Sequence, residues 1–340
     1  MFVQDVEERL MRAALKVLIV IVLVLTGIYF FGPRASDDTQ ISFKPSQIGE
    51  NVDEYLAERE SQYDDIRSGL AKQVIWNDPQ TKQKTPYSIV YLHGFSASKC
   101  EIRPVPDNIA DAMGANLFYT RLKGHARTSE AMGEATLPLW LDDLAEALEI
   151  GKRIGEKTIV ISTSTGSTLA SFALLTDQYP ELKENLEAVV MVSPNFGPNA
   201  FGAFLLAAPY AKEYVPLILG KTYGDDAGAS PERKHCWTMV YPSTALVPMA
   251  ASVDAVSRLN AEKNTVPSLF FVSEKDQTVD PAKTHAFYDQ LGGSKEWIDV
   301  ERSGDPNFHI NAGAVVSPMN DKFFTDTILD WLQGQGLFKP

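Results

Sequence analysis

The chain has 340 residues, of which 44% are hydrophobic and 22% are charged, a composition typical of globular proteins large enough to bury a sizeable core. Its 44 acidic and 31 basic side chains give a net charge of −13. Binding of nucleic acid normally needs a basic face, so this balance argues against a nucleic-acid partner.

An apolar stretch near the N-terminus predicts a membrane anchor. Residues 13–31 carry one charge, on Lys16, and reach about 20 residues, the length that crosses a bilayer as a helix. A buried core helix would show more polar positions. Residues 32–37 lack a good small-residue cleavage site, which favours an uncleaved anchor over a signal peptide, although the sequence does not settle whether the segment is ever cleaved.

Basic residues predict the orientation of this anchor. Arg9, Arg12 and Lys16 precede or begin the span, whereas only Arg34 follows it closely. The positive-inside rule then places the N-terminus in the cytoplasm and the rest of the chain outside it, in the periplasm if the source is a bacterium. We therefore expect a cytoplasmic stub with an anchor over 1–34, a polar linker over 35–50, and a folded domain over 51–340.

The folded domain reads as an alternation of apolar strands and amphipathic helices. Strands are predicted at 72–77, 87–93, 115–122, 158–162, 188–193, 268–273 and 297–300, and helices at 51–67, 105–113, 139–154, 166–178, 281–291 and 318–332. Such an alternation is typical of an α/β fold, with a mostly parallel sheet covered by helices on both faces.

One stretch interrupts the alternation. About 70 residues, rich in aromatic and aliphatic side chains, separate the strands at 188–193 and 268–273. This is too long for a plain crossover, although a pair of crossover helices with a long loop remains the alternative. We expect an inserted cap at about 195–264 over the carboxyl ends of the strands, with Phe201, Phe204 and Leu205 as candidate substrate contacts.

Residues 158–170 hold the first sign of chemistry. They read as a short strand, a tight turn at Ser164 and a helix, which is the setting of a nucleophile elbow. The usual pattern is G-x-S-x-G, and here Ser162 stands in place of the first glycine. Ser164 is the predicted nucleophile.

A serine nucleophile needs a histidine and a carboxylate downstream of it. Among the five histidines, His309 follows the last predicted strand and is the expected base. Asp276 comes directly after the strand at 268–273 and is the expected acid, because the neighbouring Asp280 precedes a proline and better suits a helix N-cap.

Two backbone amides should stabilise the developing oxyanion. One belongs to Thr165, the residue after the nucleophile, and the other to Phe95 in the loop after the strand at 87–93. In this interpretation His93 braces the loop instead of titrating in catalysis.

These residues resemble the α/β-hydrolase superfamily. The resemblance rests on His93-Gly-Phe, Arg121-Leu-Lys-Gly-His-Ala126, Ser162-Thr-Ser-Thr-Gly166, Asp276 and His309, and it covers about residues 72–335. It is strongest to bacterial carboxylesterases and monoacylglycerol lipases of the serine aminopeptidase S33-like branch. In those lipases the stretch at 124–126 commonly reads Gly-His-Gly, so Ala126 is a second departure. The resemblance implies a lipophilic acyl pocket beneath a mobile cap.

The expected function is cleavage of carboxylic esters through an acyl-enzyme, without cofactor or metal, and the expected substrate is a small-molecule or lipid-like ester, with aromatic esters included. A peptidase of the S33-like type, with Glu213, Asp225 and Asp226 holding a substrate ammonium, is one alternative. A non-catalytic binding protein on the same fold is another. Acyl length, leaving group and oligomeric state stay open, as does pairing of Cys100 with Cys236, which depends on their distance.

Overall fold

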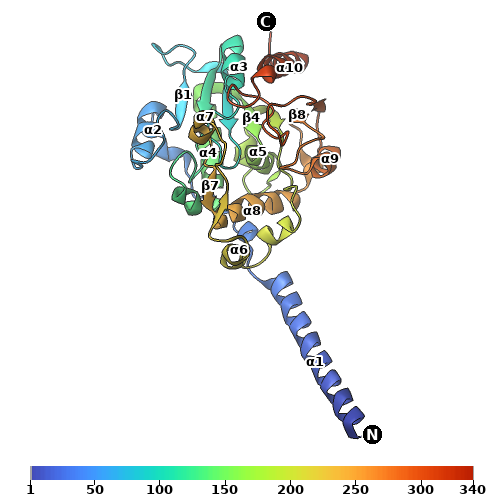
Figure 1. Ribbon diagram of the computed structural model, residues 1–340. Helices are drawn as coiled ribbons and strands as arrows, with labels where there is room; N and C mark the ends of the chain where they lie inside the picture. Colours follow the sequence, from blue (N-terminus) through green and yellow to red (C-terminus); the bar gives the residue numbers. More distant parts are fainter. Residues whose placement is uncertain (1, 340) are drawn as a thin grey trace.

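The computed structural model describes residues 2–339. Met1 and Pro340 lie outside the described residues; they are the first residue of the region predicted at 1–34 and the last of the region predicted at 51–340. A long helix, α1 (Phe2–Phe31), projects away from a single folded domain, and the C-terminus lies at the opposite end of that domain (Figure 1). Among the described residues one helix is long and apolar enough to span a membrane, Glu7–Asp37, and its apolar part is not buried in the folded domain.

The domain is built on a seven-stranded sheet in the order β1-β3-β2-β4-β5-β8-β9. Every neighbouring pair is parallel except β1 with β3. The strands are β1 (Gln73–Ile75), β2 (Thr85–Leu92), β3 (Asn116–Tyr119), β4 (Gly155–Thr163), β5 (Leu186–Val192), β8 (Ser268–Val272) and β9 (Lys295–Asp299). The central strands are buried on both faces, which explains why their sequences are almost continuously apolar.

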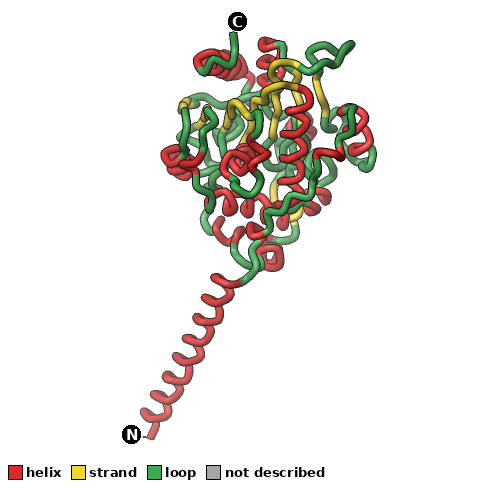
Figure 2. The backbone as a smooth tube through the Cα atoms, turned by 180° about the vertical axis from the view of Figure 1, so that it is seen from behind, coloured by secondary structure: helices red, strands yellow, loops and turns green. Residues whose placement is uncertain are grey.

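Helices cover both faces of this sheet, and Figure 2 shows the strands enclosed among them. One face packs against α3 (Val105–Met113) and α10 (Asp321–Gly334). The other packs against α4 (Leu137–Ile154), α5 (Thr165–Leu175) and α8 (Leu246–Ser257), with α9 (Pro281–Gln290) beside them. Side chains of β5 alternate between the two cores, with Val189 and Met191 on one side and Val190 and Val192 on the other.

The chain between α1 and the domain differs from the predicted plain linker. Residues 35–50 lie along the domain surface because they carry apolar side chains among the polar ones: Ile48 is fully buried, and Ile41 and Phe43 pack against the core. The following helix, α2 (Val52–Glu60), is capped by Asn51, whose side chain accepts hydrogen bonds from two backbone amides. It ends about seven residues earlier than predicted.

The long insertion between β5 and β8 consists of two parts. The first part contains the 3₁₀ turn η5 (Ala203–Ala207), α6 (Ala211–Leu219), α7 (Pro231–Cys236), and the short antiparallel strands β6 (Thr222–Gly224) and β7 (Val240–Pro242). The second part is α8, which packs against α5 on the face of the sheet. The predicted cap at about 195–264 includes both parts, of which α8 is buried along most of its length.

Cys100 and Cys236 form a disulfide that links the loop after β2 to the end of α7. Neighbouring hydrogen bonds join the same segments: the Thr238 N–H donates to the Ser96 carbonyl at 2.7 Å, and the Ser98 hydroxyl donates to the Cys236 carbonyl at 2.8 Å. This part of the cap is thus fixed to the loop that carries Phe95.

Candidate active site

Ser164 lies in a sharp turn between β4 and α5. Its φ of 50° is unusual for a residue with a side chain, and its N–H donates to the Val192 carbonyl of β5 at 2.9 Å. A Cβ at position 166 would lie 2.1 Å from the Leu92 carbonyl oxygen, so only glycine lets α5 approach β2 this closely. Ser162 fits in place of the usual first glycine because its buried hydroxyl donates a hydrogen bond to the Val190 carbonyl at 2.9 Å.

The structure brings His309 and Asp276 to this serine. The His309 Nε2 lies 3.0 Å from the Ser164 Oγ, and the His309 Nδ1 lies 2.8 Å from the Asp276 Oδ2. The other Asp276 oxygen accepts the backbone N–H groups of Thr278 and Val279 at 2.8 and 2.9 Å, which fixes the carboxylate in the turn after β8.

The loop that carries His309 is held by a second carboxylate. One Asp305 oxygen accepts the backbone N–H groups of His309 and Ile310 at 3.2 and 3.1 Å. Burial by itself lowers the pKa of His309, but the adjacent Asp276, together with the charges of Glu101 and Asp305, raises that pKa above its usual value. Such a histidine binds a proton readily and is suited to act as a base.

The two amides predicted to bind an oxyanion are available. Phe95 and Thr165 flank Ser164, and within residues 2–339 neither backbone N–H donates to another group of the protein. Phe95 follows Gly94, and Thr165 is the first residue of α5, where the first amides of a helix have no intrahelical partner.

His93 and His125 lie together beneath the Phe95 loop. The Nε2 of His93 accepts the Leu122 N–H at 3.0 Å, while its Nδ1 lies 2.8 Å from the Gly94 carbonyl. Burial lowers the pKa of His93 to about 4, so this ring is neutral and spans two loops. Ala126, where related sequences commonly carry glycine, adopts a φ of 58°, so the left-handed turn forms there without a glycine.

Glu101 is a site residue that sequence reasoning missed. It is 2% exposed and lies in the wall of the same pocket as Ser164 and His309. Its Oε2 accepts the Gly94 N–H at 2.7 Å and the Tyr91 hydroxyl at 2.8 Å. Burial raises the pKa of Glu101 to about 7, although these two hydrogen bonds and His309 oppose the rise. A single glutamate seven residues beyond Gly94 gave no sequence signal of this burial.

Ser164 and His309 open into a cavity of about 780 Å³ between the sheet and the cap, a size that suits a small-molecule or lipid ligand. Most of its wall is apolar. Of the three predicted contacts, Phe201 and Leu205 line the cavity, whereas Phe204 does not. Among the acidic cap residues, Asp225 lines it, Glu213 lines a separate pocket, and Asp226 pairs with Lys234 on the surface.

No metal-binding cluster of three or more His, Cys, Asp or Glu side chains occurs among residues 2–339. The described site offers a serine hydroxyl, a buried histidine paired with a carboxylate, and two backbone N–H groups, a set that suits nucleophilic attack and stabilisation of an oxyanion.

Comparisons with known proteins agree with the architecture. A family model described as serine aminopeptidase, S33, matches residues 83–301. One of the metagenome-derived lipolytic enzymes LipS and LipT is similar in structure, with a TM-score of 0.60 and 18% identity over 79% of this chain and 99% of that one. No curated protein sequence matches the chain.

Two monoacylglycerol lipases are also similar in structure. The enzyme of Paleococcus ferrophilus gives a TM-score of 0.54 at 13% identity, over 78% of this chain and 99% of that one. A soluble variant of the monoglyceride lipase from Saccharomyces cerevisiae, in complex with a substrate analogue, gives 0.57 at 12% identity, over 78% and 91%. At such low identity these similarities show the α/β-hydrolase fold.

Proposed function

Because this chain belongs to the serine aminopeptidase S33 family of the α/β-hydrolases, we propose that it is a serine hydrolase that cleaves carboxylic esters. The observation that carries the proposal is the continuous hydrogen-bonded arrangement from Asp276 through His309 to Ser164, at 2.8 and 3.0 Å. These three residues lie in the chain order that the fold uses for its catalytic groups.

The reaction follows from the positions of these groups. The Ser164 Oγ attacks the ester carbonyl carbon while the His309 Nε2 accepts its proton, and Asp276 stabilises the imidazolium that forms. The carbonyl oxygen becomes an oxyanion that accepts the Phe95 and Thr165 N–H groups. The intermediate then expels the alcohol, which takes the proton from His309, and leaves an acyl-serine. Water, deprotonated by His309, releases the carboxylic acid and restores Ser164.

The cavity favours a substrate with a long apolar part. Its wall contains ten large apolar side chains: Phe201, Leu205, Leu206, Val215, Ile218, Leu219, Met239, Tyr241, Leu246 and Met249. A volume of about 780 Å³ accommodates an acyl chain, and apolar walls bind such a chain by removing it from water. The proposed substrate class is therefore a lipid-like ester.

We further propose that α1 anchors the hydrolase domain to a membrane, with that domain outside the cytoplasm. From residue 7 onward its apolar side chains are exposed on all sides and are not buried against the described domain, as expected of a helix that spans a bilayer. A removable signal sequence would have the same appearance, so retention of the intact chain in the membrane fraction is the observation that separates the two.

Ester hydrolysis is tested with the purified full-length chain and its Ser164→Ala variant. We expect turnover of p-nitrophenyl esters and labelling of Ser164 by a fluorophosphonate, and we expect the variant to lose roughly 10⁴-fold or more in kcat/KM. Asp280→Asn, which alters a neighbouring helix cap, is the matched control and should retain activity. Absence of both turnover and labelling in the unaltered chain would contradict the proposal.

A peptidase of the S33 type is the second candidate, favoured by Glu101 and Asp225 in the cavity wall. Such carboxylates could hold a substrate ammonium. Aminoacyl anilides hydrolysed faster than matched esters would support this candidate over the first. A Ser164→Ala variant that keeps the full biological effect of the protein would instead support a non-catalytic binding role.

A further inference from the structure

The outer part of the cap exposes an unusual number of large apolar side chains. We call residues 201–223 the cap tip. Phe201 is fully exposed, Leu217 is 84% exposed, and Phe204 and Ile218 are about two-thirds exposed. Exposed apolar side chains gathered on one short segment mark a surface that contacts another molecule or a membrane.

The cap tip lies directly against the end of α1. The Tyr210 N–H donates to the Pro33 carbonyl at 3.3 Å, and the Arg34 Nη1 donates to the Ala207 carbonyl at 3.1 Å. A Cβ at position 32 would lie 2.7 Å from the Pro209 Cβ, so Gly32 allows the helix to end against the cap. In Figure 1, α6 lies beside the point where α1 leaves the domain.

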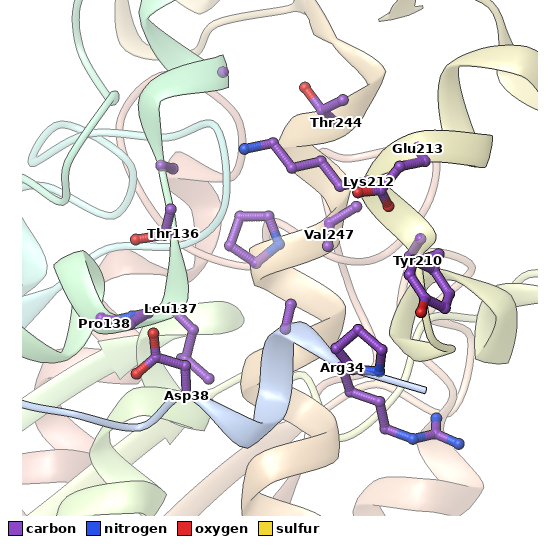
Figure 3. A pocket seen from close by; sticks show the side chains of 16 residues that line it. Arg34, Asp38, Thr136, Leu137, Pro138, Tyr210, Lys212, Glu213, Thr244 and Val247 are labelled. Carbon is purple, nitrogen blue, oxygen red and sulfur yellow. The ribbon is translucent and has the colours of Figure 1, made fainter. Parts of the chain in front are cut away.

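Figure 3 shows this junction from close by. Arg34 and Asp38, which follow α1, lie around a pocket of about 340 Å³ together with Tyr210 and Glu213 of the cap. Thr136, the N-cap of α4, and the first two residues of that helix form another part of its wall. Residues 33–38, directly after α1, therefore lie between the cap and the start of α4. The position of the bilayer relative to the cap tip then follows from the position of α1.

A helix crosses the hydrocarbon core of a bilayer with about 20 residues. If α1 spans from about residue 12, its aromatic residues Tyr29, Phe30 and Phe31 fall at the interface, where aromatic side chains are enriched. The cap tip lies at the same level because it contacts residues 32–34. Lys212 and Lys221, both exposed, flank its apolar residues and can reach lipid phosphates.

The cap tip is also continuous with the candidate active site. Five of its side chains are exposed to solvent and also line the cavity that contains Ser164, namely Phe201, Leu205, Ile218, Leu219 and Tyr223. An acyl chain that leaves a bilayer at this point can enter the cavity without exposing its full length to water.

We propose that the cap tip is a membrane-docking surface, which lies in the interface of the bilayer that α1 spans and admits a single-chain lipid ester from that bilayer into the cavity. The docking itself depends on the anchoring of α1, and the entry of the ester rests on the proposed esterase function. The occupant is the lipid bilayer; a second copy of the chain on the same surface is the competing outcome.

Docking is tested on the full-length chain in phosphatidylcholine vesicles. Cys100 and Cys236 are bonded to each other, so a Leu217→Cys variant offers one thiol for an environment-sensitive fluorophore. Lys322→Cys on α10, at the far end of the domain, is the control. We expect lipids with a quenching group to quench the label at position 217 at least about threefold more strongly than the label at position 322.

Equal quenching of the labels at positions 217 and 322 would overturn the docking. So would the combination of two results for the Leu217→Cys variant: efficient cross-linking of two unlabelled chains through this thiol, and no quenching of the labelled chain by the lipids. These outcomes do not involve catalysis, so failure of docking is distinguishable from failure of the proposed esterase function.

Lipid entry is tested with Phe204→Ser combined with Leu217→Ser, because neither side chain lines the cavity. We expect hydrolysis of a long-chain monoacyl ester embedded in vesicles to fall by about tenfold, while hydrolysis of a water-soluble short-chain ester stays within about twofold. Met319→Ser, an exposed apolar residue next to α10, is the matched control. Equal loss on both esters would overturn lipid entry through the tip.

Discussion

At the scale of single residues, Glu101 and His309 influence each other's protonation. The negative charge of Glu101 raises the pKa of His309, and His309 in turn lowers that of Glu101. The hydrogen bond from the Gly94 N–H to Glu101 also holds the His93–Gly94 peptide, one peptide before the Phe95 N–H that is the proposed oxyanion donor. Glu101 is thus placed to affect both the base and the oxyanion site without being the nucleophile or the base itself.

This coupling predicts a change in pH dependence. The proposed base must be neutral to accept the Ser164 proton, so kcat/KM should fall as the pH drops through the raised pKa of His309. Glu101→Gln removes a negative charge that raises this pKa, and the acid limb of the profile should therefore move to lower pH. The pH dependence of kcat/KM for a soluble ester is the measurement.

Two further variants separate positioning from charge. Glu101→Ala also removes the acceptor of the Gly94 N–H, and we expect kcat to fall by about tenfold, less than the roughly 10²- to 10³-fold loss when an oxyanion donor is removed. Glu274→Gln, beside the surface residue His285, should leave the profile unchanged. An acid limb of Glu101→Gln at the same pH as the unaltered chain would contradict the coupling.

At the scale of elements, the sequence predicted the order of strands and helices because each buried strand is a continuous apolar run and each helix carries an apolar stripe. Ser164, Asp276 and His309 could be proposed because loops at the carboxyl ends of such strands converge. Glu101 could not be found, since only the folded chain shows that this carboxyl is buried. The packing of α8 on α5 could not be predicted either, because it is a tertiary contact with no local signature.

A buried ionic cluster joins α2 and α4 to Lys72, the residue just before β1. The Lys72 Nζ contacts Asp143 at 2.9 Å and also Glu146, while the Glu60 carboxylate binds Arg121 and the Lys72 N–H. Burial opposes the charge of Lys72, but its acidic neighbours raise the pKa of the ammonium above the usual value. The cluster fixes the edge of the sheet to the α4 face of the domain.

Removal of one partner from this cluster should be costly. We expect Lys72→Met to lower the free energy of unfolding by about 3–5 kcal/mol, because it leaves uncompensated buried carboxylates. Lys82→Met is the matched control, since Lys82 pairs with Asp53 at the surface and should contribute at most about 1 kcal/mol. Chemical unfolding followed by tryptophan fluorescence gives both values. Similar losses in the two variants would mean that the buried cluster has no special role in stability.

At the scale of the whole molecule, the basic residues before α1 and the disulfide favour the same proposed orientation. Basic residues precede the apolar part of α1, which favours a cytoplasmic N-terminus. The cap tip lies at the opposite end of that helix, beside residues 32–34. The disulfide between Cys100 and Cys236 is stable in oxidising compartments, and reducing conditions in a cytoplasm would oppose it. The proposed orientation therefore places lipid entry and the disulfide on the same side of the membrane.

This orientation makes the state of the cysteines a test of topology. When the full-length chain is expressed in a bacterial host, we expect it to stay in the membrane after an alkaline wash and its cysteines to resist alkylation until reduced. In a strain that lacks the periplasmic oxidant DsbA, both thiols should become reactive, since the bond forms there by exchange with that protein. A Cys236→Ser variant, with a single thiol that reacts in both strains, calibrates the labelling. Two reactive thiols in the normal host would contradict the proposed orientation. They would place the hydrolase domain in the cytoplasm and the cap tip at the cytoplasmic surface of the membrane.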